Sequence, residues 1–208
     1  MSDVTRRDAL TVMSIVPLAA ALGVTPDVIE RAMQGVQQAQ QQQTPFKPKF
    51  FSAHEWRTVR VLVDLIIPRD ERSGSATDAG VPEFMDFIMI DRPGMQAQMR
   101  GGLRWLDNES VDRFGKRFVE VTATQKTSVL DDIAWPRRAR PEMSQGVAFF
   151  NYIRDLTAGG FWSSRIGVRD IGYIGNQFLA EWNGCPPEAM DRLGVNPELM
   201  TSRIPFQR

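Results

Sequence analysis

The sequence predicts an all-α protein: a single helical domain of about five or six helices, with an irregular C-terminal region rich in aromatic residues and glycine. Two observations support this fold class. Apolar residues recur at intervals of three and four in several segments, which is the period of one face of an α-helix. Segments that alternate apolar and polar residues, as strands do, are scarce. At 208 residues the chain is long enough to bury a substantial core in one domain.

The composition argues against several classes of function. Lysine and arginine together number 25, and so do aspartate and glutamate, so the chain has no net basic field that would attract nucleic acid. A single histidine and a single cysteine supply little material for a transition-metal site, and no disulfide can form within the chain. Metal, haem and Cys–His chemistry are therefore not expected.

Residues 1–24 are expected to be an export signal. Arg6 and Arg7 precede an apolar run, Ala9–Val24, that is shorter than the roughly 20 residues needed to cross a bilayer and that contains Pro17. A pair of arginines before a weakly hydrophobic segment is similar to a twin-arginine export signal, although Ala9 stands where a bulky residue is usual. The alternative is an amphipathic N-terminal helix of a cytosolic protein.

The chain carries no sequence fingerprint for a nucleotide or a haem group. It has no GxGxxG motif after a strand, no P-loop and no CxxCH motif. Twin-arginine export moves proteins that are already folded, which suits complexes that acquire a cofactor in the cytoplasm. An export signal of this kind on a chain without its own cofactor suggests that the chain carries a cofactor-bearing partner across the membrane.

Residues 25–49 are expected to be a short helix followed by a linker rich in glutamine and proline. The helical stretch begins at Thr25-Pro26 and runs to about Val36, with a modest apolar face. Residues 37–43 are nearly all glutamine, and the following TPFKPKF contains spaced prolines. Such segments bury too little surface to order themselves, which predicts a linker. The alternative is an extended arm that wraps a partner.

The helical domain is expected over residues 50–192, and its first helix is the clearest. Ser52 and Glu55 have the spacing of a capping box, which marks a helix start, and Pro68 ends the helix. His54 lies in the first turn, where we expect a solvated side chain rather than a metal ligand or a base. The buried face repeats at helical spacing through Trp56, Val59, Leu62, Val63, Ile66 and Ile67.

The next segments alternate loops and helices. Residues 69–80 are polar, small and turn-rich and predict a solvated loop rather than a calcium site. Val81-Pro82 restarts a helix, because proline suits the first helical position. A further helix is expected from Met95 to about Phe114, either continuous or broken at Gly101-Gly102. Thr122 and Gln125 form a second capping box that opens a helix ending at Trp135-Pro136.

The last clear helix of the domain is predicted from Ser144 to about Ala158, with Gly159-Gly160 as its cap. The basic run between Trp135 and Pro141 is interpreted as a solvated loop, with contact to an anionic partner as the lesser alternative. A short helical piece is expected near Glu188–Leu193, and residues 193–208 form a polar tail.

The segment from Phe161 to Gly184 combines five aromatic residues with several glycines and few strong helix formers. Aromatic side chains bury large areas, and glycine lets a backbone approach another surface closely. We therefore expect a shaped, mostly non-helical surface that binds another molecule; the alternative is a lid over the chain's own core. The expected interface residues are Phe161, Trp162, Gly172, Tyr173, Gly175, Asn176 and Trp182. Cys185 is either a partner in an inter-chain disulfide or a buried free thiol.

Taken in order, these landmarks resemble the gluconate 2-dehydrogenase subunit 3 family. The residues that carry the resemblance are the leader with Arg6-Arg7, EWRTVRVLVDLIIPRD at 55–70, AGVPEFMD at 79–86, FFNYIRDLTAGGFWSSRIGVRDIGYIGN at 149–176 and the following Trp182-Asn183-Gly184. The resemblance implies a non-catalytic small subunit. A large FAD-dependent flavoprotein of the glucose–methanol–choline type would oxidise the sugar, and a cytochrome c would often accept the electrons. It also implies a periplasmic location, with Arg6-Arg7 serving the export of both chains and the small subunit contributing to the stability of the large one.

Two other functions stay open from the residues alone. A stand-alone enzyme would need an acid–base site, for which Asp64, Asp70, Asp86 and Asp170 are the candidates. A chaperone-like helical module would leave its client after export. The resemblance implies that the sugar and the carbon oxidised are chosen in the large subunit, so gluconate, glucose, fructose and glycosides all stay open.

Overall fold

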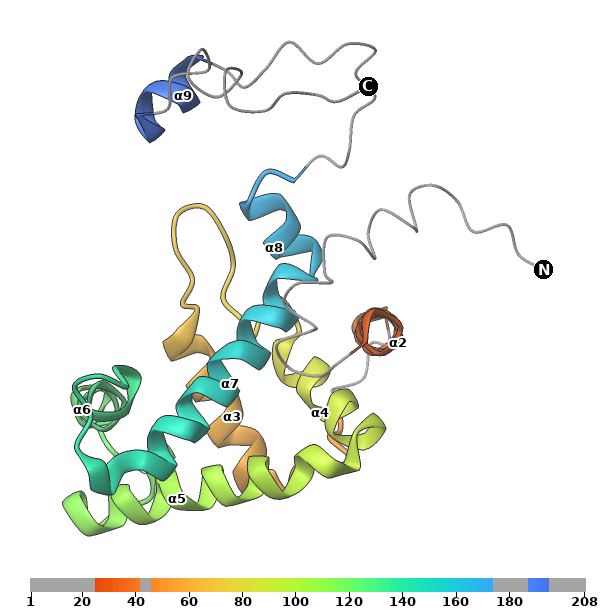
Figure 1. The fold of residues 1–208 in the computed structure, drawn as a ribbon. Helices are drawn as coiled ribbons and strands as arrows, with labels where there is room; N and C mark the ends of the chain where they lie inside the picture. Colours follow the sequence, from red (N-terminus) through yellow and green to blue (C-terminus); the bar gives the residue numbers. More distant parts are fainter. Residues whose placement is uncertain (1–24, 42–45, 174–186, 195–208) are drawn as a thin grey trace, which may run out of the picture. The chain divides into compact units, whose positions relative to one another are not determined.

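The computed structural model describes residues 25–41, 46–173 and 187–194, and within these ranges all regular structure is helical, which confirms the all-α prediction (Figure 1). The α-helices are α2 (Pro26–Gln41), α3 (Ala53–Ile66), α4 (Val81–Asp91), α5 (Gln96–Phe114), α6 (Ala123–Ala134), α7 (Ser144–Trp162), α8 (Arg165–Asp170) and α9 (Pro187–Leu193). Three 3₁₀ turns are η1 (Pro93–Met95), η2 (Phe118–Glu120) and η3 (Pro141–Met143). The chain divides into two units, residues 1–175 and 176–208, and α9 belongs to the second.

Helix α7 is the central element of the first unit, and it contacts α3, α4, α5, α6 and α8 (Figure 1). Its sequence explains this position, because buried side chains occur on more than one face. Phe149, Ile153, Leu156 and Phe161 are each at most 3 % exposed. A helix that is apolar over most of its circumference is expected to be covered on several sides.

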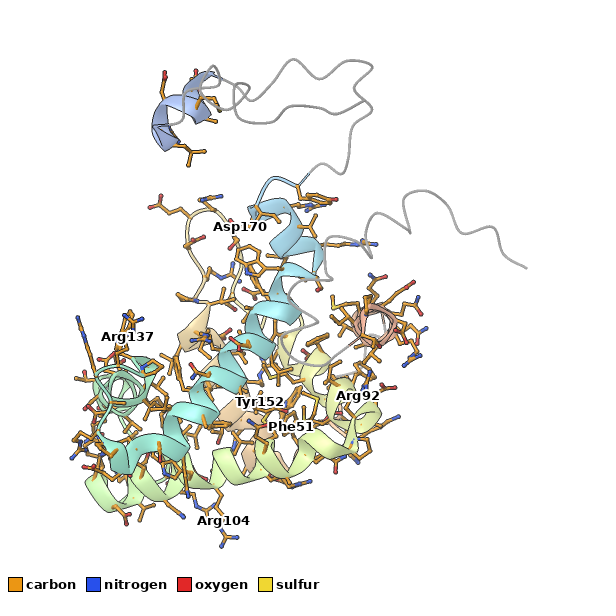
Figure 2. The ribbon with its side chains drawn as sticks, in the orientation of Figure 1. Phe51, Arg92, Arg104, Arg137, Tyr152 and Asp170 are labelled. Carbon is orange, nitrogen blue, oxygen red and sulfur yellow. The ribbon has the colours of Figure 1, made fainter. Side chains whose placement is uncertain are left out.

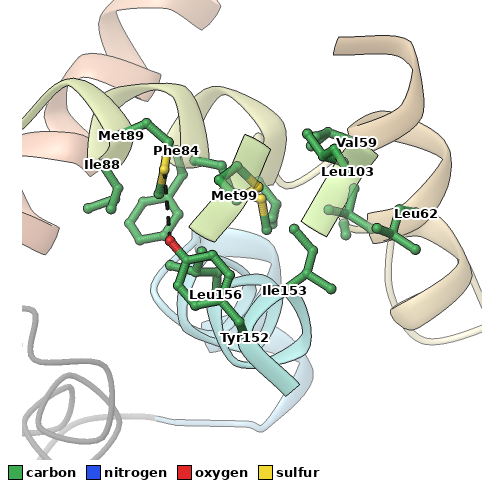
Figure 3. Packing of buried hydrophobic residues seen from close by; sticks show 14 of the residues in the cluster. Val59, Leu62, Phe84, Ile88, Met89, Met99, Leu103, Tyr152, Ile153 and Leu156 are labelled. Atoms are coloured by element: carbon green, nitrogen blue, oxygen red, sulfur yellow. Dashed lines mark hydrogen bonds between the residues drawn. The ribbon is translucent and has the colours of Figure 1, made fainter. Parts of the chain in front are cut away.

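The core lies where α3, α4 and α5 meet α7 (Figure 3). Tyr152 is the one polar side chain labelled there, and its hydroxyl points to Met89 Sδ at 3.8 Å and to the carbonyl of Met95 at 3.4 Å. Burial raises the pKa of Tyr152, so the hydroxyl stays protonated and can donate. The labelled apolar residues are Val59, Leu62, Phe84, Ile88, Met89, Met99, Leu103, Ile153 and Leu156.

The predicted helix starts are confirmed. Ser52 Oγ accepts the backbone N–H of Glu55 while the Glu55 carboxylate accepts the backbone N–H of Ser52. Thr122 and Gln125 make the same reciprocal pair at the start of α6. These caps satisfy donors that a helix leaves unpaired at its first turn, and they depend only on residues three apart. For this reason the sequence alone locates them.

Neither the candidate break of α5 at Gly101-Gly102 nor the predicted end of α7 at Gly159-Gly160 is present, and in both cases a glycine serves close packing. Helix α5 runs unbroken through Gly101 and Gly102, and a side chain on Gly102 would overlap the ring of Phe149. Helix α7 does not end at Gly159-Gly160 but continues to Trp162, because Gly160 makes room for Phe84 of α4. The tertiary contact outweighs the low helix propensity of glycine.

Helix α2 extends beyond the predicted end near Val36 and includes part of the glutamine run. It packs on α4 through buried residues: Val28, Ile29, Ala32 and Val36 are each at most 5 % exposed. Gly35 faces the ring of Phe87 on α4, where an added Cβ would come within 2.8 Å. Apolar residues packed against a neighbouring helix stabilise α2, which a glutamine run by itself would not do.

Candidate functional site

The candidate interface is built around the joint between α7 and α8. Ser164 caps α8: its Oγ accepts the backbone N–H of Gly167 at 3.1 Å and donates to the carbonyl of Phe161 at 2.7 Å. A side chain on Gly167 would overlap that same carbonyl, so only glycine permits α8 to fold back this closely on α7. The end of α7 is therefore a fixed corner rather than a free end.

Phe161 does not lie on the surface, which corrects its assignment as an interface residue. Its side chain is fully buried in the core, and it contacts the ring of Trp162 edge-on, with centroids 4.9 Å apart and planes at 85°. The reason is helical phase: Phe161 continues the buried face of α7, while the next residue points outward. Phe161 thus supports Trp162 from beneath.

Three large apolar side chains near this corner are exposed to solvent. Trp162 is 37 % exposed, Ile171 is 56 % exposed and Tyr173 is 36 % exposed. Gly172 has a φ of 65°, a left-handed conformation that ends α8 and directs the chain into Tyr173. We call Trp162, Ile171 and Tyr173 the corner patch. Ile171 was missed from the sequence, because the segment was expected to be non-helical and so gave no helical phase by which to place this side chain.

The expectation of a mostly non-helical segment from Phe161 is wrong for its first part, since α7 reaches Trp162 and α8 spans Arg165–Asp170. Several expected site residues lie outside the described residues: Arg6, Arg7, Gly175, Asn176, Trp182 and Cys185. Trp162, Gly172 and Tyr173 are described and come from one corner of the first unit.

Residues 69–80 lie beside α8 (Figure 2). The Asp70 carboxylate accepts backbone N–H groups within this segment. Arg72 donates to the Asp170 carbonyl at 2.7 Å and approaches its carboxylate at 3.5 Å. Backbone N–H groups of Ser73 and Arg72 lower the pKa of Asp70. The Arg72–Asp170 contact fixes this loop to the end of α8 next to the corner patch.

The carboxylates considered for an acid–base site have structural partners. Asp64 accepts the backbone N–H of Thr77, Asp70 accepts two backbone N–H groups of its own loop, and Asp170 pairs with Arg72. Asp86 is fully buried and accepts three backbone N–H groups. Within the described ranges no three His, Cys, Asp or Glu side chains gather as a metal site would require.

His54 is not solvated as expected from the sequence. Its Nε2 lies 2.5 Å from Asp107 Oδ2, and the two side chains are only 23 % and 18 % exposed. The other carboxylate oxygen of Asp107 accepts the backbone N–H of Phe118 at 3.1 Å. The pair joins the first turn of α3 to α5 and η2. Partners 53 positions apart leave no local signal, so sequence reasoning could not have found the contact.

No helix among the described residues is both long and apolar enough to cross a membrane.

A comparison with known protein families identifies a match. The model of a family described as gluconate 2-dehydrogenase subunit 3 matches residues 53–181, from the first turn of α3 to beyond α8. No curated protein and no solved structure matches the chain. The matched range contains α3 to α8, the His54–Asp107 pair and the corner patch.

Proposed function

The chain belongs to the gluconate 2-dehydrogenase subunit 3 family, and from that premise we propose that it is the non-catalytic small subunit of an FAD-dependent sugar or alcohol dehydrogenase. In this proposal the chain binds the large flavoprotein subunit, stabilises it and supports its export to the periplasm. FAD belongs to the partner, and a cytochrome c accepts the electrons. The family match over α3 to α8 is the observation that carries the proposal.

The corner patch is the surface that we assign to the flavoprotein. An exposed tryptophan, tyrosine and isoleucine on a fixed corner lose little conformational freedom on binding, which favours them as anchors. Aromatic residues are enriched among the side chains that dominate binding energy, and truncating one typically costs about 2 kcal/mol or more. The edge-on support of Trp162 by the buried Phe161 ring holds one anchor in place.

Export follows from the leader in the same proposal. Arg6 and Arg7 precede a weakly apolar run, as in twin-arginine signals, which direct proteins that are already folded. A single leader on the small subunit would carry both chains if the complex assembles in the cytoplasm. This gives the small subunit a role that needs no catalytic residue of its own.

Co-purification tests the assignment. The full chain would be co-expressed with a candidate FAD-dependent large subunit, either as wild type or as the Trp162→Ala, Tyr173→Ala double variant. We expect the double variant to lose most of the retained flavoprotein. The matched control is Trp135→Ala, which removes an even more exposed tryptophan, at 59 %, from the turn after α6.

Equal recovery of flavoprotein with a folded double variant would reject the corner patch as the interface. Recovery that is only transient, with no stable complex for the wild type, would favour the chaperone-like alternative. Sugar oxidation by the purified small chain alone would favour the stand-alone enzyme.

A further inference from the structure

A cleft of about 570 Å³ opens between the first turn of α3, one face of α5 and the turn at Arg117. On α5 its lining residues follow helical spacing: Arg100, Arg104, Asn108 and Val111 share one face of the helix. The His54–Asp107 pair also lines the cleft. This cleft is separate from the corner patch, whose residues do not line it.

The acidic side chains of the cleft already have hydrogen-bond partners within the chain. Arg100 holds Glu55 through contacts of 3.0 and 3.1 Å, and its other nitrogen donates to the carbonyl of Phe50 at 2.9 Å. Asp107 is occupied by His54 and by the backbone N–H of Phe118. Each carboxylate of the cleft is therefore engaged by donors other than Arg104 and Arg117.

The guanidinium groups of Arg104 and Arg117 differ from that of Arg100, because they have no carboxylate partner among the described residues. Arg104 and Arg117 are both exposed, and neither makes an ion pair within 4.0 Å to any part of the chain that the structure describes. Arg104 projects outward from α5 (Figure 2). The Asn108 amide adds neutral donors on the same face, and Val111 supplies exposed apolar surface. Uncompensated positive charge in a concave site concentrates anions there.

We propose that this cleft binds a small carboxylate or phosphate anion, held by Arg104 and Arg117. The planar guanidinium fork matches both anions and forms short charge-assisted hydrogen bonds with them. The exposed apolar side chain of Val111, which also lines the cleft, suits a short carbon skeleton attached to the charged group. The inference rests on the cleft alone and is independent of the proposed subunit function.

The single histidine of the chain provides the readout, because it lines this cleft and has no competing resonance. The ring resonances of His54 would be followed by NMR in the full chain during titration with inorganic phosphate and, separately, with succinate. Sodium chloride at matched ionic strength and constant pH is the reference. We expect a saturable shift with at least one of the two anions and none with chloride.

Variants assign the binding to the two arginines. The Arg104→Gln, Arg117→Gln double variant should weaken the anion about tenfold or more, since each removed group is a charged donor. Arg137→Gln, an exposed arginine in the turn after α6, should leave the affinity unchanged. Circular dichroism would establish that each variant folds, which is expected because all three side chains are exposed.

The outcomes distinguish a phosphate ligand from a carboxylate ligand, and they also show whether the proposal is wrong. Saturation by phosphate alone supports a phosphate-bearing ligand, and saturation by succinate alone supports a carboxylate. The proposal is overturned if neither anion saturates, if chloride gives the same shift, or if the double variant binds as tightly as the wild type.

Discussion

Asp86 shows at the scale of one residue how a charge is used in this fold. Its carboxylate is fully buried and accepts the backbone N–H groups of Lys49, Phe50 and Phe51 at 2.9, 2.9 and 3.1 Å. A carboxylate can accept several donors at once, which makes it suited to this position. The acid–base role considered for Asp86 is thus replaced by an anchoring role for the segment before α3.

Removing this anchor should destabilise the protein. In Asp86→Ala the three backbone N–H groups lose their acceptor, and each buried unsatisfied donor costs about 1–3 kcal/mol. We therefore expect a loss of several kcal/mol in unfolding free energy, measured by urea denaturation. Asp131→Ala, an exposed carboxylate on α6 without an ion pair among the described residues, is the control and should change little. Equal midpoints for both variants would contradict the anchoring role.

Glu83 makes a second prediction at this scale. Its Oε2 is buried without a hydrogen-bond partner among the described residues, and the nearest cation, Arg60, is 4.0 Å from Oε1. Burial raises the pKa of Glu83 above its ordinary 4.5. The folded protein therefore holds this proton to higher pH than the unfolded chain does. Stability from the group is present below pH 4.5 and is lost as pH rises through the folded pKa.

The variant Glu83→Gln is uncharged at every pH and should lose this dependence. We therefore compare the melting temperature of the variant with that of the wild type at each pH. The variant should gain on the wild type as the pH rises from about 4 to 7, because only the wild type carries a buried charge at neutral pH. Thermal unfolding of both proteins across this range measures the difference. If the difference in melting temperature between the two proteins stays constant with pH, Glu83 titrates alike in the folded and the unfolded state.

At the scale of elements, two adjacent glycines of α5 have opposite roles. An added Cβ at Gly102 would overlap the ring of Phe149, whereas at Gly101 nothing lies within 4 Å. Gly102→Ala should therefore destabilise by about 1–3 kcal/mol through overpacking. Gly101→Ala should stabilise by about 0.5–1 kcal/mol, because alanine is the better helix former. Urea denaturation of the two single variants tests this pair, and a change of the same sign in both would refute it.

The same contrast explains how much of the fold the sequence could predict. Starts of α3, α4 and α6 depend on caps or a first-turn proline, and these local signals located them. The two glycine errors concern contacts with Phe149 and Phe84, which belong to helices far away in the chain. Helix propensity counts Gly102 and Gly160 as weak points, while packing makes them necessary.

The candidate sites divide in the same way. Trp162 and Tyr173 could be picked as exposed anchors because aromatic residues next to glycines are unusual in a core helix. Phe161 could not be separated from Trp162 by composition, since only the phase of an extended α7 decides which ring is buried. The His54–Asp107 pair and the cleft around it require the α3–α5 contact, which no motif encodes.

At the scale of the whole molecule, the leader and the body are expected to act together on a partner. In the Arg6→Lys, Arg7→Lys variant the charge is kept but the twin-arginine pair is lost. We expect both this chain and the co-expressed flavoprotein to remain in the cytoplasmic fraction, detected by immunoblotting of fractionated cells. The control is Arg57→Lys, Arg137→Lys, which makes the same change at two exposed positions of the folded body. Normal export of the flavoprotein with the altered leader would show that it travels independently.

The anchoring by Asp86 has a mechanical consequence. The described segments on either side of residues 42–45 both contact α4. Helix α2 packs on α4 through its apolar side, and the backbone N–H groups of residues 49–51 donate to the Asp86 carboxylate of α4. A force that pulls on the N-terminus would act first on the packing of α2 against α4, and then on the three hydrogen bonds to Asp86. Helix α4 thus connects both N-terminal segments to the rest of the fold, and because α4 itself packs on α7, a pull on α2 would reach α7 through α4.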